Sequence, residues 1–162
     1  MIVEIGEFKN KSERYERLAE ACEEMIDPRD SAIPSLANVS ALLKAHMDDV
    51  NWLGFYLFQE GYLALGPFQG MPAVTRINLG KGVCGTAAER MKTVRVDEVK
   101  TCGNYIACDT VSSSEIVVPL VRQERLLGVL DVDSPSPRRF DEDDERGLEK
   151  IAETLVELIY CP

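Results

Sequence analysis

SEIVVPLVRQERLLGVLDVDS, residues 114 to 134, decides the fold of this chain. Two apolar runs, EIVVPLV and LLGVLDV, are rich in β-branched residues and are separated by the polar stretch from Arg122 to Arg125. Runs of this length and composition are typical of β-strands, and a short polar stretch between them is typical of a hairpin turn. The sequence therefore predicts two antiparallel strands here, and these are its strongest strand signals.

Three carboxylates lie at the ends of these strands that are remote from the turn. Glu115 opens the first strand, and Asp131 and Asp133 close the second, two positions apart. Side chains two apart on a strand share a face, so both aspartates point to one side, at the end of the sheet where Glu115 begins. Acids gathered in this way repel one another, and at least one would have a raised pKa. The alternative is three solvated acids at strand ends, since most acids are exposed.

The same patterns extend outward along the chain. NWLGFYLF and YLALGPF predict a second hairpin around a turn at 59–61, and VTRINL and TVRVDEV predict two shorter strands. Helical spacing of apolar residues predicts helices at about 8–26 and 34–46, a short one in GTAAERM, and a last one capped by Asp141. This order predicts an α+β fold of one domain, residues 1–162, with a mostly antiparallel sheet and helices on one side.

The composition argues against several classes of partner. The 162 residues carry a formal net charge of −10, and the sequence pI is about 4.6. Nucleic acids and anionic membranes bind basic surfaces, so we expect neither as a partner. No apolar run approaches the roughly 20 residues of a membrane span. The first residues also lack the basic start and apolar middle of a signal peptide, so we expect a cytoplasmic protein.

The cysteines follow no structural pattern. Because their number is odd and their spacings are wide, a disulfide framework is not expected. The sequence has no C-x-x-C pair and a single histidine, His46, so we expect neither a metal site nor a Cys-His or Ser-His-Asp catalytic set. Cys22 falls on the apolar stripe of the first helix, where it would pack in the core. The five cysteines are Cys22, Cys84, Cys102, Cys108 and Cys161.

Cys84 lies in the glycine-rich stretch GKGVCG, residues 80–85. The stretch matches G-x-G-x-x-G between a strand and a helix, which is the dinucleotide-binding pattern. A dinucleotide site is not favoured, because the following helix is short and the later strands pair through hairpin turns. The glycines instead predict a tight turn that leaves Cys84 close to a helix N-terminus, where backbone N–H groups favour a thiolate.

Cys108 lies in a long loop from about Val99 to Ser114. Loops of this length in a compact domain are often functional. Cys108 and Cys84 are therefore the two candidates for a reactive thiol. Cys102 lies six residues before Cys108, and the spacing alone leaves open whether Cys102 reacts with Cys108 or has no role. Cys161 is next to the C-terminus, where we expect it to have no role.

The aromatic residues of NWLGFY alternate between two faces of a predicted strand. Trp52 and Tyr56 share one face, and Leu53 and Phe55 share the other. One face has to pack on the core. The other could line a ligand pocket, as aromatic side chains often do.

These motifs together resemble a known family. NWLGFYLF, LGPFQG, RINLGKGVCGTAAE, IACD, SEIVVPL and GVLDVDS are similar, in this order, to motifs of the GAF-domain enzymes that reduce free methionine-(R)-sulfoxide. The likeness covers roughly residues 30 to 160. It implies a GAF fold, a six-stranded antiparallel sheet flanked by helices, with the ligand pocket closed by loops. It also implies a homodimer and an enzyme that needs no cofactor.

The resemblance implies roles for particular residues. Cys108 would attack the sulfoxide sulfur and become a sulfenic acid. Cys84 would resolve that acid as a disulfide, which thioredoxin would reduce. The polar groups of the substrate would be bound by Glu115, Asp131 and Asp133. The S-methyl end of the substrate would pack on Trp52 and Tyr56.

Three positions depart from the family pattern. Val74 stands where many members have a third cysteine, Tyr105 stands where many have a histidine, and Cys102 is an addition. Recycling would then depend on Cys84 or on Cys102.

Two other functions fit parts of the same pattern. A GAF module can bind a small molecule or nucleotide and sense it without turnover, because a fold does not fix a function. A peroxide-reducing thiol protein would use the same cysteines and would not need the acids.

Overall fold

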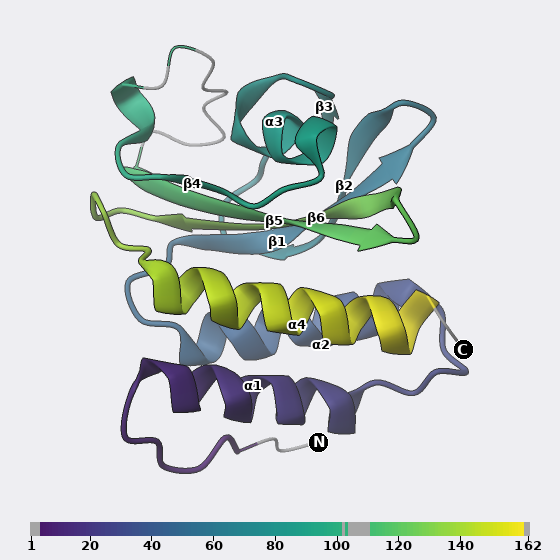
Figure 1. Cartoon of the computed structure of the whole chain (residues 1–162), viewed down its shortest axis with the longest axis vertical. Coiled ribbons are helices and arrows are strands. Elements are labelled where there is room, and N and C mark those ends of the chain that lie inside the picture. The colour runs from purple at the N-terminus through teal and green to yellow at the C-terminus, as the bar shows by residue number, and fades with distance from the viewer. Residues whose placement is uncertain (1–3, 102, 104–110, 161–162) are drawn as a thin grey trace.

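The computed structural model describes residues 4–101, 103 and 111–160 of the chain. Cys102, Cys108 and Cys161 lie outside the described residues, as does Tyr105. A six-stranded antiparallel sheet forms the centre, with α3 on one face and α2 and α4 on the other (Figure 1). Helix α1 packs against α4 and lies beyond the α2/α4 layer, farthest from the sheet. This arrangement confirms the predicted α+β fold, except that one of the four helices covers the opposite face.

The sheet has the strand order β3-β2-β1-β6-β5-β4. Both predicted hairpins are confirmed. The turn of the β5–β6 hairpin consists of Gln123 and Glu124, which have φ values of 47° and 61°, as a tight two-residue turn requires. The strands are β1 (Trp52–Gln59), β2 (Tyr62–Gln69), β3 (Arg76–Asn78), β4 (Val94–Val96), β5 (Ser114–Arg122) and β6 (Arg125–Ser134).

The helices follow the predicted apolar spacing, with small shifts at their ends. The second helix begins before Pro34, which lies in its first turn, where a missing N–H costs nothing. Asp141 caps the last helix, because its Oδ1 accepts hydrogen bonds from the backbone N–H groups of Asp143 and Asp144. The helices are α1 (Lys11–Met25), α2 (Ala32–His46), α3 (Gly82–Arg90) and α4 (Glu142–Tyr160), with a 3₁₀ turn, η1, at Val99–Thr101.

Each face of the sheet has its own apolar core. The larger core joins α1, α2 and α4 to the side chains of Leu53, Phe55 and their neighbours on β5 and β6. The smaller core joins α3 and β3 to Trp52 and Tyr56. This confirms the predicted alternation along β1, and it assigns the two ring systems of Trp52 and Tyr56 to the face that carries α3.

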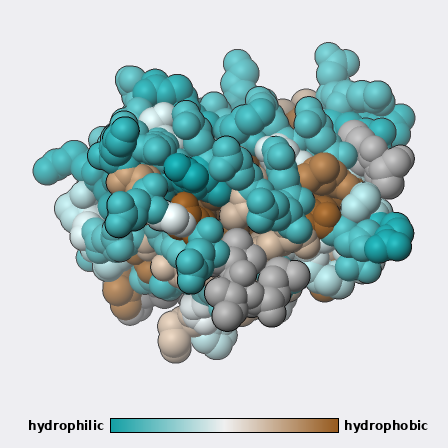
Figure 2. Space-filling view, turned by 90° about the horizontal axis from the view of Figure 1, so that it is seen from below, coloured by the Kyte–Doolittle hydropathy of each residue, from teal (hydrophilic) through white to brown (hydrophobic). Residues whose placement is uncertain are grey.

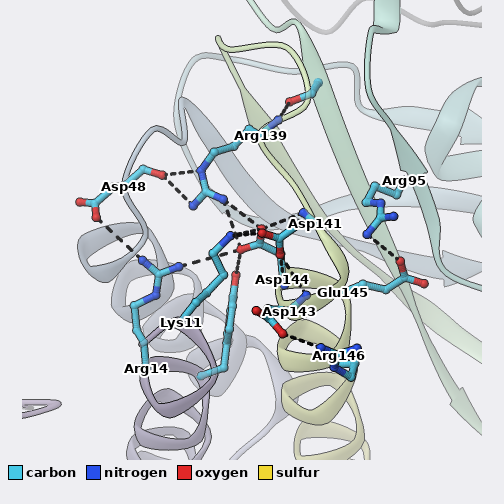
Figure 3. A network of polar contacts seen from close by, with 12 residues as sticks. Lys11, Arg14, Asp48, Arg95, Arg139, Asp141, Asp143, Asp144, Glu145 and Arg146 are labelled. Carbon is cyan, nitrogen blue, oxygen red and sulfur yellow. Dashed lines mark hydrogen bonds and ion pairs between the residues drawn. The ribbon is translucent and has the colours of Figure 1, made fainter. Parts of the chain in front are cut away.

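A network of ion pairs around Asp144 ties α1 to α4 (Figure 3). The carboxylate of Asp144 is fully buried and lies 2.8 Å from Nζ of Lys11 and 3.1 Å from Nη1 of Arg139. Nη2 of Arg14 lies 3.9 Å away, and the hydroxyl of Tyr15 donates a hydrogen bond of 2.7 Å to Asp144. Burial and the Asp144 charge raise the pKa of Tyr15. Two cations from α1 and one from the segment before α4 thus surround one buried carboxylate.

Seen from the side of α1, the surface is largely hydrophilic, and hydrophobic side chains form separate patches (Figure 2). Within the described part of the chain, no helix is both long and apolar enough to cross a membrane.

Candidate active site

The pairing of β5, β6 and β1 aligns the three carboxylates and Trp52 in two rows across the sheet. Glu115 lies directly opposite Asp133, and Asp133 lies opposite Trp52 on the other side. Asp131 lies in the next row on the same face and pairs with Gly54 of β1. All three carboxylates are buried, with exposed fractions of 5% or less. The predictions that the three acids share one end of the sheet and that Asp131 and Asp133 share one face are confirmed, and the alternative of three solvated acids is wrong.

Cys84 comes to this site from α3, which lies across that face of the sheet (Figure 1). A tight turn delivers it: Gly80 and Gly82 have φ values of 73° and 63°, and the N–H of Gly80 donates to the carbonyl of Gly85. A Cβ on Gly85 would lie 2.4 Å from the carbonyl oxygen of Asn78, so only glycine fits there. The glycine pattern therefore serves this turn, and the antiparallel sheet around it is not a dinucleotide-binding fold.

Cys84 is 4% exposed and lies in the first turn of α3. Its Sγ is 3.9 Å from Oε1 of Glu115. Burial, followed by the charges of Asp131 and Glu115, raises the pKa of the Cys84 thiol well above its usual value. The prediction that the helix N-terminus favours a thiolate is therefore wrong for this structure. Partial charges of a helix end extend over one turn, and burial beside carboxylates outweighs them.

An aromatic wall borders the carboxylates on the β1–β2 side. Trp52 stacks on Tyr56 with ring centroids 6.0 Å apart, and on Phe68 with centroids 5.3 Å apart. The indole N–H of Trp52 donates to the carbonyl of Met71, and the hydroxyl of Tyr56 donates to the carbonyl of Val74. Both aromatic residues thereby hold the segment between β2 and β3 against the same face.

Phe68 is the wall residue that the sequence analysis missed. It lies within the motif LGPFQG, but nothing in the spacing of that motif shows that its ring meets Trp52. Gly70 supports the same contact: its φ is 138°, and a Cβ there would lie 2.6 Å from the indole. Gly54 leaves similar room under the ring, since a Cβ there would lie 2.9 Å from Cη2 of Trp52.

The two ends of the loop that carries Cys108 are held together by described residues. The N–H of Val99 donates to the carbonyl of Ser113 over 2.8 Å, and Nδ2 of Asn51 donates to Oγ of Ser112 over 3.1 Å. Asn51 directly precedes Trp52, so the described ends of the loop lie beside the row of Glu115, Asp133 and Trp52. The predicted roles of Cys108 and Cys102 lie outside the described residues and stay predictions.

The fold and the buried thiol–carboxylate site together indicate a GAF-domain protein, and the comparison with known protein families agrees. Residues 39–159 match the family model described as a GAF domain. The chain belongs to the GAF family.

Relatives that are similar over nearly the whole chain identify a narrower group within the GAF family. The chain is 43% identical over 150 residues to the free methionine-R-sulfoxide reductase of Escherichia coli, covering 93% of this chain and 91% of that protein. It is 41% identical to the protein of the same name in Saccharomyces cerevisiae, over 90% and 86% of the two chains. An X-ray structure of free methionine-R-sulfoxide reductase from Neisseria meningitidis in complex with its substrate is 38% identical, with a TM-score of 0.90 over 95% of this chain and 93% of that one. The resemblance predicted from the motifs is thereby confirmed.

Proposed function

We propose that this protein is an enzyme that reduces free L-methionine-(R)-sulfoxide to methionine. The observation that carries the proposal is the juxtaposition of three buried carboxylates, a thiol and an aromatic wall on one face of the sheet. The names of the relatives support it, because each is similar to this chain over nearly its whole length. The proposal extends to the whole chain, residues 1–162, as one GAF domain that acts as a homodimer in the cytoplasm.

Recognition of a free amino acid follows from the charges of the site. A free amino acid carries an α-ammonium, whereas a residue within a peptide does not. Glu115, Asp131 and Asp133 would receive the ammonium through charge-assisted hydrogen bonds. The rings of Trp52 and Tyr56 would receive the apolar S-methyl end. Peptide-bound methionine sulfoxide should therefore be a very poor substrate.

The proposed reaction moves one oxygen atom from the substrate to a cysteine. The thiolate of Cys108 attacks the electrophilic sulfur of the sulfoxide, whose oxygen is protonated by an acid. The hydroxyl then passes from the substrate sulfur to the sulfur of Cys108, the new bond between the two sulfurs breaks, and methionine leaves, so that Cys108 remains as a sulfenic acid. The sulfur of the substrate is reduced by two electrons, and the sulfur of Cys108 is oxidised by two.

The sulfenic acid is then resolved by a second thiol. Cys84 attacks the sulfur of Cys108, a disulfide forms, and the oxygen leaves as water. A thioredoxin dithiol reduces this disulfide by exchange and becomes oxidised itself. Because burial and the neighbouring carboxylates raise the pKa of Cys84, its thiolate would form more readily when a cationic ammonium is present in the site.

A single-turnover assay of Cys108→Ser tests the nucleophile. The wild-type protein should release one equivalent of methionine from free methionine-(R)-sulfoxide without added reductant, and Cys108→Ser should release none. The matched control is Cys22→Ala, which removes a thiol from the apolar core and should keep the full equivalent. A full equivalent from Cys108→Ser would show that another residue attacks, and no release from either protein would favour a sensor without turnover.

Peptide mapping of protein oxidised by its substrate identifies the resolving thiol. We expect a disulfide between Cys84 and Cys108. The alternative is a disulfide between Cys102 and Cys108, because Val74 occupies the position of the family's third cysteine. Finding that disulfide would overturn the assignment of Cys84.

A further inference from the structure

Three different metal-ligating side chains meet at the buried end of the site. The Sγ of Cys84 and one carboxylate oxygen each from Glu115 and Asp131 all lie within 4.8 Å of one another. They come from α3, β5 and β6, and each residue is 5% exposed or less. The spacing along the chain predicted no metal site, because these three residues are 31 and 16 positions apart and only the fold brings them together.

This set of donors suits a thiophilic divalent cation. Zinc prefers four ligands in a tetrahedron and accepts cysteine sulfur together with carboxylate oxygen. With bonds of about 2.3 Å to sulfur and about 2.0–2.2 Å to oxygen, a sulfur and an oxygen ligand lie about 3.6 Å apart, and two oxygens about 3.4 Å apart. The sulfur of Cys84 and Oε1 of Glu115 are already 3.9 Å apart. Closing the set around an ion thus needs side-chain shifts of less than about 1 Å each.

We propose that Cys84, Glu115 and Asp131 form an inhibitory site for a thiophilic divalent cation such as Zn²⁺ or Cd²⁺. The cation binds the Cys84 sulfur as a thiolate, and the thiol proton is released to solvent. Three protein ligands leave a fourth coordination position for water. The three anionic donors outweigh the charge of the ion, so the cation finds a site with complementary charge.

The inhibition follows from competition between two cations. Two of the three carboxylates proposed to receive the α-ammonium of the substrate, Glu115 and Asp131, also ligate the metal, so the ammonium and the metal cannot be bound together. Metal would also occupy the sulfur that resolves the sulfenic acid. This consequence rests on the proposed function, whereas metal binding by itself does not.

Cadmium titration of the reduced, substrate-free protein tests the site directly. Binding to a thiolate gives a charge-transfer absorption in the ultraviolet, and we expect it with the first equivalent of Cd²⁺. Cys84→Ser should lose this first-equivalent absorption, and Cys22→Ala should keep it. Circular dichroism of each variant checks that it folds.

The decisive variant is Glu115→Gln, because it removes no thiol. Loss of a group that merely supports a metal ligand costs 10–100-fold in affinity, so loss of a ligand should weaken Cd²⁺ binding at least tenfold. Asp131→Asn should do the same. Glu124→Gln, which changes an exposed residue of the β5–β6 turn, is the matched control and should leave the affinity unchanged. Unchanged affinity in Glu115→Gln, or an unchanged absorption in Cys84→Ser, would overturn the proposal, since the metal would then sit on other cysteines.

Two further measurements separate this proposal from the proposed function. L-Methionine, which carries the same ammonium as the substrate, should weaken Cd²⁺ binding, and Zn²⁺ should raise the apparent KM for the sulfoxide in the reductase assay. If the protein shows no turnover at all, yet Cd²⁺ binds with the dependence on Glu115 given above, the metal site stands and the reductase function fails. If turnover is normal and Zn²⁺ leaves KM unchanged, the inhibitory role is wrong.

Discussion

Two buried polar clusters among the described residues have opposite electrostatics. At the junction of α1 and α4, three cations surround the carboxylate of Asp144, as described above and shown in Figure 3. On the other side of the sheet, carboxylates from β5 and β6 lie beside the thiol of Cys84, and burial together with these charges raises its pKa. The first cluster brings unlike charges together, and the second brings like charges together.

This difference in charge indicates that one cluster stabilises the fold and that the other serves the function. Buried unlike charges that also form hydrogen bonds hold two helices in one arrangement, and removing one partner strands the others. Like charges on neighbouring strands oppose folding, so a chain keeps them only where they serve another purpose. We infer that the Asp144 cluster holds the fold and that the acids beside Cys84 bind a cation, whether ammonium or metal.

The largest expected effect is on the Asp144 cluster. Asp144→Asn should lower the free energy of unfolding by about 3–5 kcal/mol, because it leaves the buried Arg14 and the largely buried Arg139 without their carboxylate. Urea denaturation measures this loss. The matched control is Asp143→Asn, which removes an exposed partner of Arg146 and should change stability by less than about 0.5 kcal/mol. Equal small losses in both variants would show that Asp144 is not a structural charge.

The next effect is on substrate choice. Asp133→Asn should lower kcat/KM for free methionine-(R)-sulfoxide by at least about tenfold, since a hydrogen bond to a charged group contributes roughly 1.5–3 kcal/mol. N-Acetylation of the substrate should cost the wild-type enzyme at least as much, because it removes the ammonium. Asp133→Asn should damage the N-acetylated substrate less than the free one. Equal rates on free and N-acetylated sulfoxide would contradict the role given to the three carboxylates.

A third prediction compares two buried thiols. Burial in the apolar core raises the pKa of Cys22 to about 12, and burial beside acids raises the pKa of Cys84. Both thiols stay protonated in the folded protein when the unfolded chain ionises, so stability is complete below the unfolded pKa of about 9 and falls above it. The Cys22 thiol should cost about 1.4 kcal/mol at pH 10, and the Cys84 thiol should lower stability in the same direction.

Urea denaturation at pH 8 and pH 10 checks the third prediction. Cys22→Ala and Cys84→Ser should each reduce the loss of stability between the two pH values, whatever they do to stability at pH 8. A loss that neither variant reduces would mean that other groups, such as Tyr15, cause the alkaline destabilisation.

The sequence predicted the parts of the site that depend on local periodicity. The period-two alternation of LDVDS assigned Asp131 and Asp133 to one face, and the polar turn at 122–125 placed Glu115 at the same end. The alternation in NWLGFY separated Trp52 from the apolar core in the same way. These predictions held because a strand of known register has only two faces.

Contacts between distant segments could not be predicted in this way. Lys11 and Asp144 are 133 positions apart, and no local pattern shows that they form an ion pair. The stacking of Phe68 on Trp52 and the donor set around Cys84 depend on the same kind of long-range packing. The raised pKa of Cys84 follows from that packing as well. For this reason the position of Cys84 at a helix N-terminus led to the wrong prediction of a thiolate. The substrate came from the resemblance of motifs and not from spacing.

The smallest expected effect has the opposite sign from the largest. Glu115 lies directly opposite Asp133 across β5 and β6, where two like charges destabilise the pair. Glu115→Gln keeps the shape of the side chain and removes one of the charges, so stability at pH 7 should stay level or rise by about 0.2–1 kcal/mol. The same variant should lose activity on the free sulfoxide, which a purely structural residue would not combine with a gain in stability. Urea denaturation beside a reductase assay measures both. A loss of stability as large as that of Asp144→Asn would mean that the carboxylate of Glu115 is a structural charge, and the contrast between the two clusters would fail.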